Sequence, residues 1–182
     1  ATAAAATPAP TAIPQPPAPV AQHYSTITTW AEFDTWLAAI NAAALTAIDT
    51  ETTSLHAMQA QLIGISLCVQ AGHAAYIPLG HEGADTPEQL PLQAVLDKLR
   101  PWLEDASKPK LGQHIKYDSH VFANHGLTIR GYQHDTMLQS YVLEAHKPHS
   151  LESLALRHLG RSGASYESIC GKGAQQIPFA HV

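Results

Sequence analysis

The stretch LTAIDTETTSL, residues 45–55, ends an apolar run with two carboxylates one residue apart. Its apolar and β-branched content predicts a buried strand over residues 44–51. Residues i and i+2 of a strand project to the same face, so Asp49 and Glu51 are expected to point the same way. Two such carboxylates repel each other unless a cation lies between them, and their hard oxygens suit Mg²⁺ or Mn²⁺. A strand end with solvated acids is the alternative interpretation.

The chain on either side of this stretch predicts strands that alternate with helices. Residues 61–69 and 73–79 are predicted to form an antiparallel hairpin, and residues 109–114 a short strand. Apolar residues at helical spacing predict further helices over residues 28–43, 87–105, 115–126, 135–144 and 150–160. An initial hairpin followed by alternating strands and helices indicates an α/β protein with a mixed sheet.

Composition separates the first residues from the rest of the chain. Residues 1–22 contain nine Ala and six Pro and no charged residue, which predicts a disordered or extended linker. They lack the basic region and long apolar core of a signal peptide, and no later stretch has transmembrane length. Residues 23–182 are expected to form one domain. The chain starts without Met and with a linker, so we expect a piece of a longer protein.

The charge distribution limits how this chain can bind nucleic acid. The net charge is −5, and residues 1–97 hold eight acidic residues and no Lys or Arg. This charge argues against a broad phosphate-binding surface, so any contact with nucleic acid is expected to be local, through metal ions that neutralise the carboxylates. The twelve histidines and Cys68 and Cys170 lack the spacing of a zinc site. We expect both cysteines to be free buried thiols in a reducing cytoplasm.

A third acid strengthens the hypothesis of a metal site. The segment QHIKYD, residues 113–118, follows a short strand and opens a helix that carries Asp118 about one turn in. This position lies near the carboxyl end of a strand, where open α/β sheets place their sites. Together with Asp49 and Glu51, it could hold two divalent ions at the roughly 3.5–4 Å separation of phosphoryl-transfer sites. For Asp118 alone, a solvated helix acid is the alternative.

Four segments, in the same order along the chain, resemble the 3′–5′ exonuclease domain of bacterial DNA polymerase I. That domain belongs to the family A polymerases. The resemblance covers residues 24–182 and is carried by LTAIDTETTSL, QLIGISLCVQAGHAAYIPLGH, LGQHIKYDSHVFANHGLTIRGYQHDTMLQSYVL and SLESLALRHLG. DTE resembles the first exonuclease motif and QHIKYD the second. The resemblance implies a ribonuclease-H-like fold, a mixed β-sheet with flanking helices, incomplete at the C-terminus. The family's third motif, Tyr-x-x-x-Asp, would follow Val182.

The resemblance implies that Asp49, Glu51 and Asp118 are catalytic ligands of two Mg²⁺ or Mn²⁺ ions. Metal-activated water would attack the 3′-terminal phosphodiester of single-stranded DNA and release a nucleoside monophosphate, which is proofreading. Without the third motif, we expect this fragment to degrade DNA negligibly. The implied partners are the single-stranded 3′ end and a polymerase domain of the same parent chain, with no membrane, and the implied location is the bacterial cytoplasm with its nucleoid.

Two alternatives to this function stay open. A polymerase can keep such a domain as a catalytically silent scaffold, but the three retained carboxylates favour activity. A free-standing exonuclease that trims RNA 3′ ends shares the first two motifs. The Ala/Pro-rich linker and the match around GHAAYIPLGH and GKG favour the polymerase.

The resemblance also implies contacts with the DNA strand. Leu55 would wedge against the terminal base, near Tyr166, while Gln113 and Tyr117 would touch the single strand. His114 stands where many relatives have Asn, which puts its contact in doubt. Packing is the alternative for the apolar and aromatic members of this set. Asp135 is interpreted as a helix cap rather than a site residue.

Overall fold

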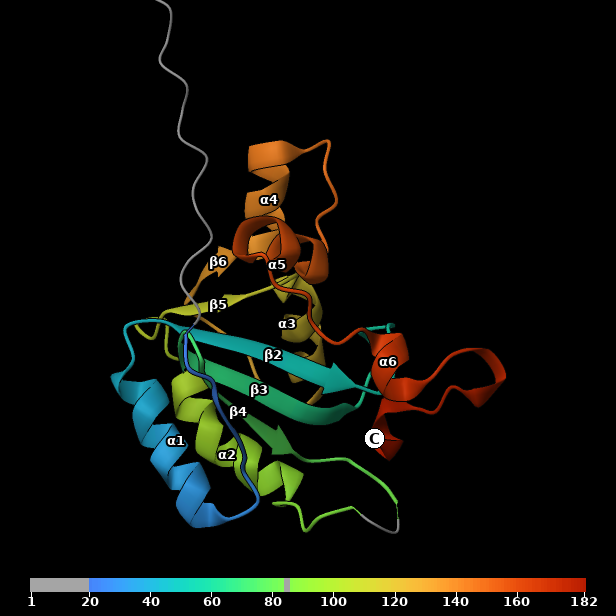
Figure 1. Ribbon diagram of the computed structural model, residues 1–182. Helices are drawn as coiled ribbons and strands as arrows, with labels where there is room; N and C mark the ends of the chain where they lie inside the picture. The colour runs from blue at the N-terminus through green and yellow to red at the C-terminus, as the bar shows by residue number, and fades with distance from the viewer. Residues whose placement is uncertain (1–19, 84–85) are drawn as a thin grey trace, which may run out of the picture.

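The computed structural model describes residues 20–83 and 86–182. Its strands are β1 (His23–Thr26), β2 (Thr46–Thr52), β3 (Leu62–Gln70), β4 (His73–Pro78), β5 (Lys110–Gly112) and β6 (Tyr132–Asp135). They form one sheet in the order β1-β4-β3-β2-β5-β6. β2, β3 and β4 are antiparallel, whereas β1, β5 and β6 run parallel to their neighbours. The predicted mixed sheet is confirmed (Figure 1).

The helices are α1 (Trp30–Ala42), α2 (Leu92–Leu103), α3 (Ile115–Asn124), α4 (Thr136–Glu144), α5 (Leu151–Leu159) and α6 (Tyr166–Cys170). Short 3₁₀ turns follow at Gly173–Gln175 and Phe179–His181. Thr29 caps α1 in a capping box with Glu32, and Ser150 and Gly160 bound α5. The prediction for α2 began too early, because Gln89 exchanges two hydrogen bonds with the backbone of His81 and Pro91 is the cap.

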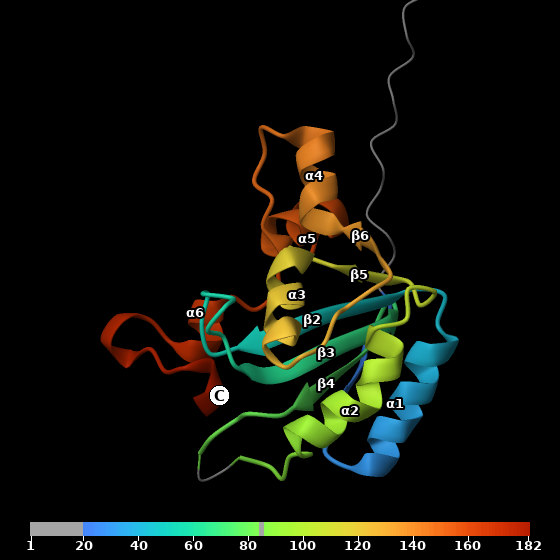
Figure 2. The same ribbon diagram turned by 180° about the vertical axis from the view of Figure 1, so that it is seen from behind.

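Helices α1, α2 and α3 lie against the same face of the sheet (Figure 2). Their apolar side chains pack on those of β2, β3 and β4 in one core that includes Phe33, Ile48, Ile65, Leu96 and Phe122. Burying each such side chain stabilises the fold by about 1.5–3 kcal/mol. Helices α4 and α5 lie beyond β5 and β6, and α6 lies at the end of β2 (Figures 1 and 2).

The structure can also be compared with the predictions for the linker, the cysteines and membrane-spanning segments. Most of the predicted linker lies outside the described residues, which begin at the exposed Val20. Both cysteines are free, but only Cys170 is buried, whereas Cys68 is partly exposed. Among the described residues, every helix is too short or too polar to cross a membrane.

Candidate active site

The predicted acids lie where β2 and β5 part. The two strands pair only at Thr46 with Lys110 and Ala47 with Leu111. Further along β2, the backbone N–H of Thr50 donates to Oδ1 of Asp118 at 3.2 Å, and the Thr50 hydroxyl donates to the same oxygen at 2.6 Å. Asp118 is 2% exposed. Helix α3 thus places this carboxylate on the open edge of the strand that carries the other two acids.

One carboxylate, that of Asp135, fixes the start of α3. Its Oδ2 accepts a hydrogen bond from the Ile115 N–H at 3.0 Å, and its Oδ1 accepts one from the His114 N–H at 3.2 Å. The same Oδ1 accepts hydrogen bonds from the N–H groups of Met137 and Leu138 at the start of α4. The predicted cap is therefore confirmed, and it serves two helices. By fixing the N-terminus of α3, it also sets the position of Asp118 one turn later.

Asp49 and Glu51 alternate with the buried Ile48 and Thr50 along β2, as the strand period predicts. Asp49 is exposed and Glu51 half-buried. Glu51 pairs with Gly64 of β3, just before a shift in register. A Cβ on Gly64 would lie 2.0 Å from the hydroxyl oxygen of Tyr76. Only glycine therefore leaves room for Tyr76 beside Glu51.

Burial raises the pKa of all three carboxylates, and repulsion between carboxylates adds to this for Glu51 and Asp118. Burial raises the pKa of Glu51 to about 7, and repulsion by Asp49 and Asp118 adds to this. Burial also raises the pKa of Asp118 to about 7, with Asp49 contributing and the hydrogen bonds from Thr50 opposing. The pKa of Asp49 is raised as well, because the surrounding protein reduces its solvation although its side chain reaches solvent. Buried carboxylates that lie close together favour a proton or a cation that compensates their charge.

The chemistry of this donor set fits a divalent cation. Carboxylate oxygens are the ligands that Mg²⁺ and Mn²⁺ prefer, and their mutual repulsion would be relieved by the ion. In the arrangement described for residues 20–83 and 86–182, no three side chains of Asp, Glu, His or Cys are drawn together closely enough to hold a metal ion. The predicted pair of ions therefore stays a prediction.

The predicted wedge and aromatic residues share one cavity. It has a volume of about 610 Å³ and is lined by Thr50, Glu51, Thr52, Thr53, Ser54, Leu55, Tyr117, Tyr166 and Gln176. Leu55 is 95% exposed, so the alternative that it closes a core is wrong. Tyr166, at the start of α6, is 53% exposed and brings an aromatic ring from a distant part of the chain. The cavity thus joins the end of β2 to α6.

The polar groups of Tyr117 and Gln113 are engaged within the protein. The Tyr117 hydroxyl contacts the carbonyl oxygen of Ser54 and the hydroxyl of Thr52. The Gln113 amide donates to the carbonyl oxygen of His149 at 2.8 Å and accepts from the Thr136 hydroxyl at 2.5 Å. Tyr117 therefore orders residues 52–54, and Gln113 connects β5 to α4 and to the turn that precedes α5.

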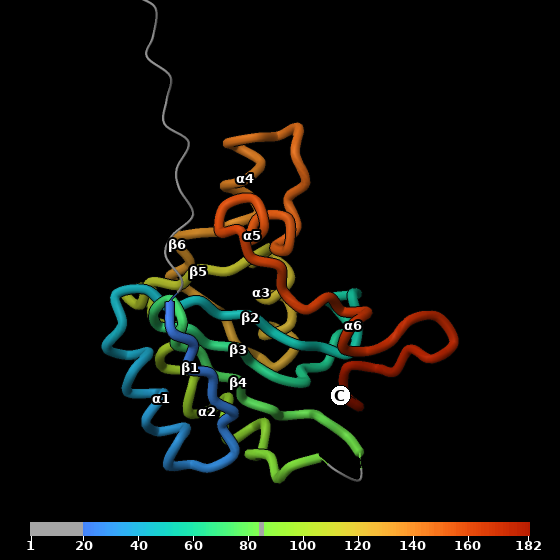
Figure 3. Tube along the Cα trace, viewed as in Figure 1, coloured from blue at the N-terminus to red at the C-terminus, as the bar shows by residue number. Residues whose placement is uncertain are grey.

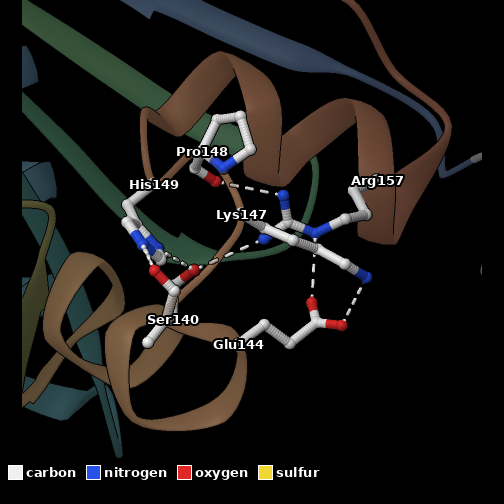
Figure 4. Close-up of polar contacts among 7 residues, drawn as sticks. Ser140, Glu144, Lys147, Pro148, His149 and Arg157 are labelled. Atoms are coloured by element: carbon white, nitrogen blue, oxygen red, sulfur yellow. Dashed lines mark hydrogen bonds and ion pairs between the residues drawn. The ribbon is translucent and has the colours of Figure 1, made fainter.

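A polar network holds the turn that precedes α5 in place (Figure 4). The Glu144 carboxylate pairs with Lys147 at 2.5 Å and with Nε of Arg157 at 3.3 Å. Arg157 also donates to the carbonyl oxygen of Pro148 at 3.0 Å and to the Ser140 hydroxyl at 3.3 Å. That hydroxyl contacts Nδ1 of His149 at 2.8 Å. The network thereby fixes the carbonyl group to which Gln113 donates.

His114 is the residue before α3 and has an unusual backbone. Its φ of 61° and ψ of 46° place it in the left-handed region, the one non-glycine residue with positive φ among those described. Asn tolerates this region better than most residues. This gives a structural reason to expect Asn at this position, as the family resemblance implies.

Sequence reasoning missed Thr50 and Gln176. A strand pattern assigns Thr50 to the face opposite the two acids, and only the parting of β2 from β5 shows that it binds Asp118. Gln176 reaches the cavity through the loop that follows α6, for which no periodic pattern exists.

Comparisons with known proteins show the family and the fold of this chain. A family model described as 3′–5′ exonuclease matches residues 24–181. DNA polymerase I of Pseudomonas aeruginosa is 48% identical over 162 residues, which cover 87% of this chain. The chain spans only 18% of that relative's length.

Solved structures share the fold at lower identity. The POL domain of Pol1 from M. smegmatis, in complex with a DNA primer-template and dNTP, superposes with a TM-score of 0.61 and 24% identity, over 76% of this chain and 23% of that one. Escherichia coli RNase D, an exoribonuclease involved in structured RNA processing, has a TM-score of 0.58 and 22% identity, over 81% of this chain and 36% of that one.

Proposed function

The chain belongs to the 3′–5′ exonuclease family found in DNA polymerase I, and on that premise we propose that it hydrolyses the 3′-terminal phosphodiester of single-stranded DNA. The parent protein would be a DNA polymerase I in which this domain proofreads. The observation that carries the proposal is the set of Asp49, Glu51 and Asp118 at the end of β2, beside a cavity that presents Leu55 and Tyr166.

The three carboxylates would help to hold two Mg²⁺ or Mn²⁺ ions. When bound, such ions stabilise charge on the attacking and leaving oxygens and make water more acidic. The protein's own part is to aim the ligands. Thr50 fixes Oδ1 of Asp118 with two hydrogen bonds, while Asp49 and Glu51 offer oxygens from one face of β2. Burial raises the pKa values of Glu51 and Asp118 to about 7, and a bound cation would hold both carboxylates in the ionised form.

The cavity residues would hold the end of the strand. Leu55 would wedge against the terminal base and the Tyr166 ring would stack near it, a sequence-tolerant contact that suits removal of any nucleotide. Tyr117 would act by ordering the loop that carries Leu55, and Gln113 by fixing the surroundings of α3. His114 would contact a phosphate or sugar. We propose that the protein works in the bacterial cytoplasm, with the nucleoid.

An RNA 3′-end trimming exonuclease is the second candidate, supported by the likeness to RNase D. A catalytically silent scaffold is the third, but mutual repulsion of three retained carboxylates favours a working site. The higher identity and coverage of the DNA polymerase I relative support DNA as the substrate.

The test uses the full-length protein with 5′-labelled single-stranded DNA and RNA of the same sequence in Mg²⁺. We expect stepwise shortening of DNA from the 3′ end, release of nucleoside monophosphates, and loss of both in Asp49→Ala. The thermal midpoint of that variant should match the parent and so exclude unfolding. Preferential shortening of RNA would support the second candidate, and no shortening of either would support the scaffold.

A further inference from the structure

The segment after α6 forms a closed loop that ends at the cavity. Figure 3 shows the chain running out from α6 and returning beside it. Gly171, with φ of 81°, begins the reversal, and a Cβ there would lie 2.8 Å from the carbonyl oxygen of Gln175. The Ile177 N–H donates to the Cys170 carbonyl at 2.8 Å and closes the loop. Within it, the Gln176 N–H donates to the carbonyl oxygen of Gly173 at 3.1 Å.

This reversal of the chain places Gln176 on the cavity wall to which Tyr166 also contributes. Both side chains line the cavity with Leu55 and Glu51, although they are separated by the whole loop. The pKa of Tyr166 is raised, chiefly through the neighbouring Cys170, and the Gln176 side chain opposes this rise, which places Gln176 near the Tyr166 hydroxyl. The aromatic face and the amide therefore stand together on one side of the cavity.

The polar groups of this cavity differ in what they offer a nucleotide. Ionised Glu51 can only accept hydrogen bonds, and the Tyr117 hydroxyl is used by the loop that it orders. The Gln176 amide carries both a donor and an acceptor. By turning over, it can meet either kind of group on a base edge, while the ring of Tyr166 meets the base face.

We infer that Gln176 is a substrate-binding residue that hydrogen-bonds the edge of the terminal base stacked on Tyr166, whichever of the four bases that is. The inference rests on the proposed function, because it names a contact of the same substrate in the same cavity. The chain supplies a matched control in Gln175, which is also exposed and lies on the same loop but is not among the residues that line the cavity.

The experiment compares full-length Gln176→Ala and Gln175→Ala with the parent. Digestion is measured in Mg²⁺ on single-stranded oligonucleotides ending in each of the four bases. Binding is measured in Ca²⁺, through the fluorescence of an oligonucleotide with 2-aminopurine at its 3′ end. We expect Gln176→Ala to raise KM about 3- to 10-fold for all four ends, as loss of one hydrogen bond predicts, with kcat changed less than about 2-fold.

The same variant should weaken binding of the 2-aminopurine oligonucleotide by a similar factor, whereas Gln175→Ala changes neither quantity. Gln176→Glu keeps the side-chain length but loses the donor, and it should raise KM at least as much. Equal thermal midpoints exclude a folding defect. If Gln176→Ala and Gln176→Glu behave like Gln175→Ala while Asp49→Ala is inactive, the inference is wrong and the function stands. If the parent neither shortens nor binds DNA 3′ ends, both fail.

Discussion

Asp118 and Asp135 are both buried carboxylates near the carboxyl ends of β2, β5 and β6, and they are used in opposite ways. Asp135 accepts hydrogen bonds from four backbone N–H groups, shared between its two oxygens. Asp118 accepts two hydrogen bonds from Thr50, and both meet one oxygen. Both oxygens of Asp135 therefore accept hydrogen bonds that hold the fold. Asp118 keeps one oxygen that can bind a cation.

The difference shows how burial can serve structure or chemistry. A carboxylate that accepts several backbone hydrogen bonds, as Asp135 does, holds helix ends in place. A carboxylate that is buried beside like charges, with few donors, favours a proton or a cation, and its pKa rises accordingly. Number of donors, rather than depth of burial, therefore separates the structural acid from the candidate catalytic one.

The largest expected effect separates the two residues by activity. Asp118→Asn keeps the shape of the side chain but removes its charge, so nuclease activity of the full-length protein should fall by on the order of 10²- to 10³-fold. Its stability should not fall, because a strained buried charge is lost. Digestion assays and chemical denaturation measure the two quantities. Near-normal digestion by this variant would remove Asp118 from the site.

The converse substitution tests the structural acid. Asp135→Ala leaves four N–H groups at the starts of α3 and α4 without their acceptor, so we expect the free energy of unfolding to fall by about 2–4 kcal/mol. Urea denaturation checks this value. A loss below about 1 kcal/mol would mean that water replaces the shared cap.

Stability in the absence of divalent cations should depend on pH in a way that reflects the raised pKa values. Asp118 and Glu51 bind protons up to about pH 7 in the folded state, against 3.8 and 4.5 ordinarily. The folded protein therefore holds more protons than the unfolded chain between about pH 4 and 7, and the contribution of these groups to stability declines as pH rises through that window. Denaturation in EDTA should show this slope, and Asp118→Asn should reduce it. If the stability of Asp118→Asn changed with pH as steeply as that of the parent, the raised pKa of Asp118 would be contradicted.

The smallest expected effect concerns His114, through which Asp135 is connected to the helix of Asp118. His114 donates its N–H to Asp135 and precedes the helix of Asp118, with a left-handed backbone. His114→Asn should stabilise the fold by about 0.5 kcal/mol, because Asn adopts this conformation more readily. Thermal unfolding measures the gain. His114→Ala is the control and should give none.

The sequence allowed the regular elements to be predicted where apolar side chains repeat. β2, β3, β4 and the helices α1, α3, α4 and α5 carry such patterns, and all were predicted. β1 and β6 were missed, because each has four residues, mostly exposed or polar, and exists only through pairing with a distant strand. α6 was missed because it is a single short turn after a polar loop.

The same limit applies to the candidate site. Asp49, Glu51 and Asp118 are visible as acids next to a strand end and a helix start. The role of Thr50 depends on where two strands separate, and that of Gln176 on how a glycine reverses the chain. The first is a long-range property and the second the conformation of an irregular loop, and periodic spacing carries no signal for either.

The shared cap at Asp135 also links two helices during folding. α3 and α4 begin at residues 115 and 136, yet their first N–H groups depend on one side chain. Asp135 directly precedes α4, whereas it reaches the start of α3 only when β6 has docked beside β5. Because one carboxylate serves both helix starts, we expect them to open together when the protein fluctuates. Asp118 lies one turn after the start of α3, so we expect loss of this cap to loosen its hydrogen bonds with Thr50 as well.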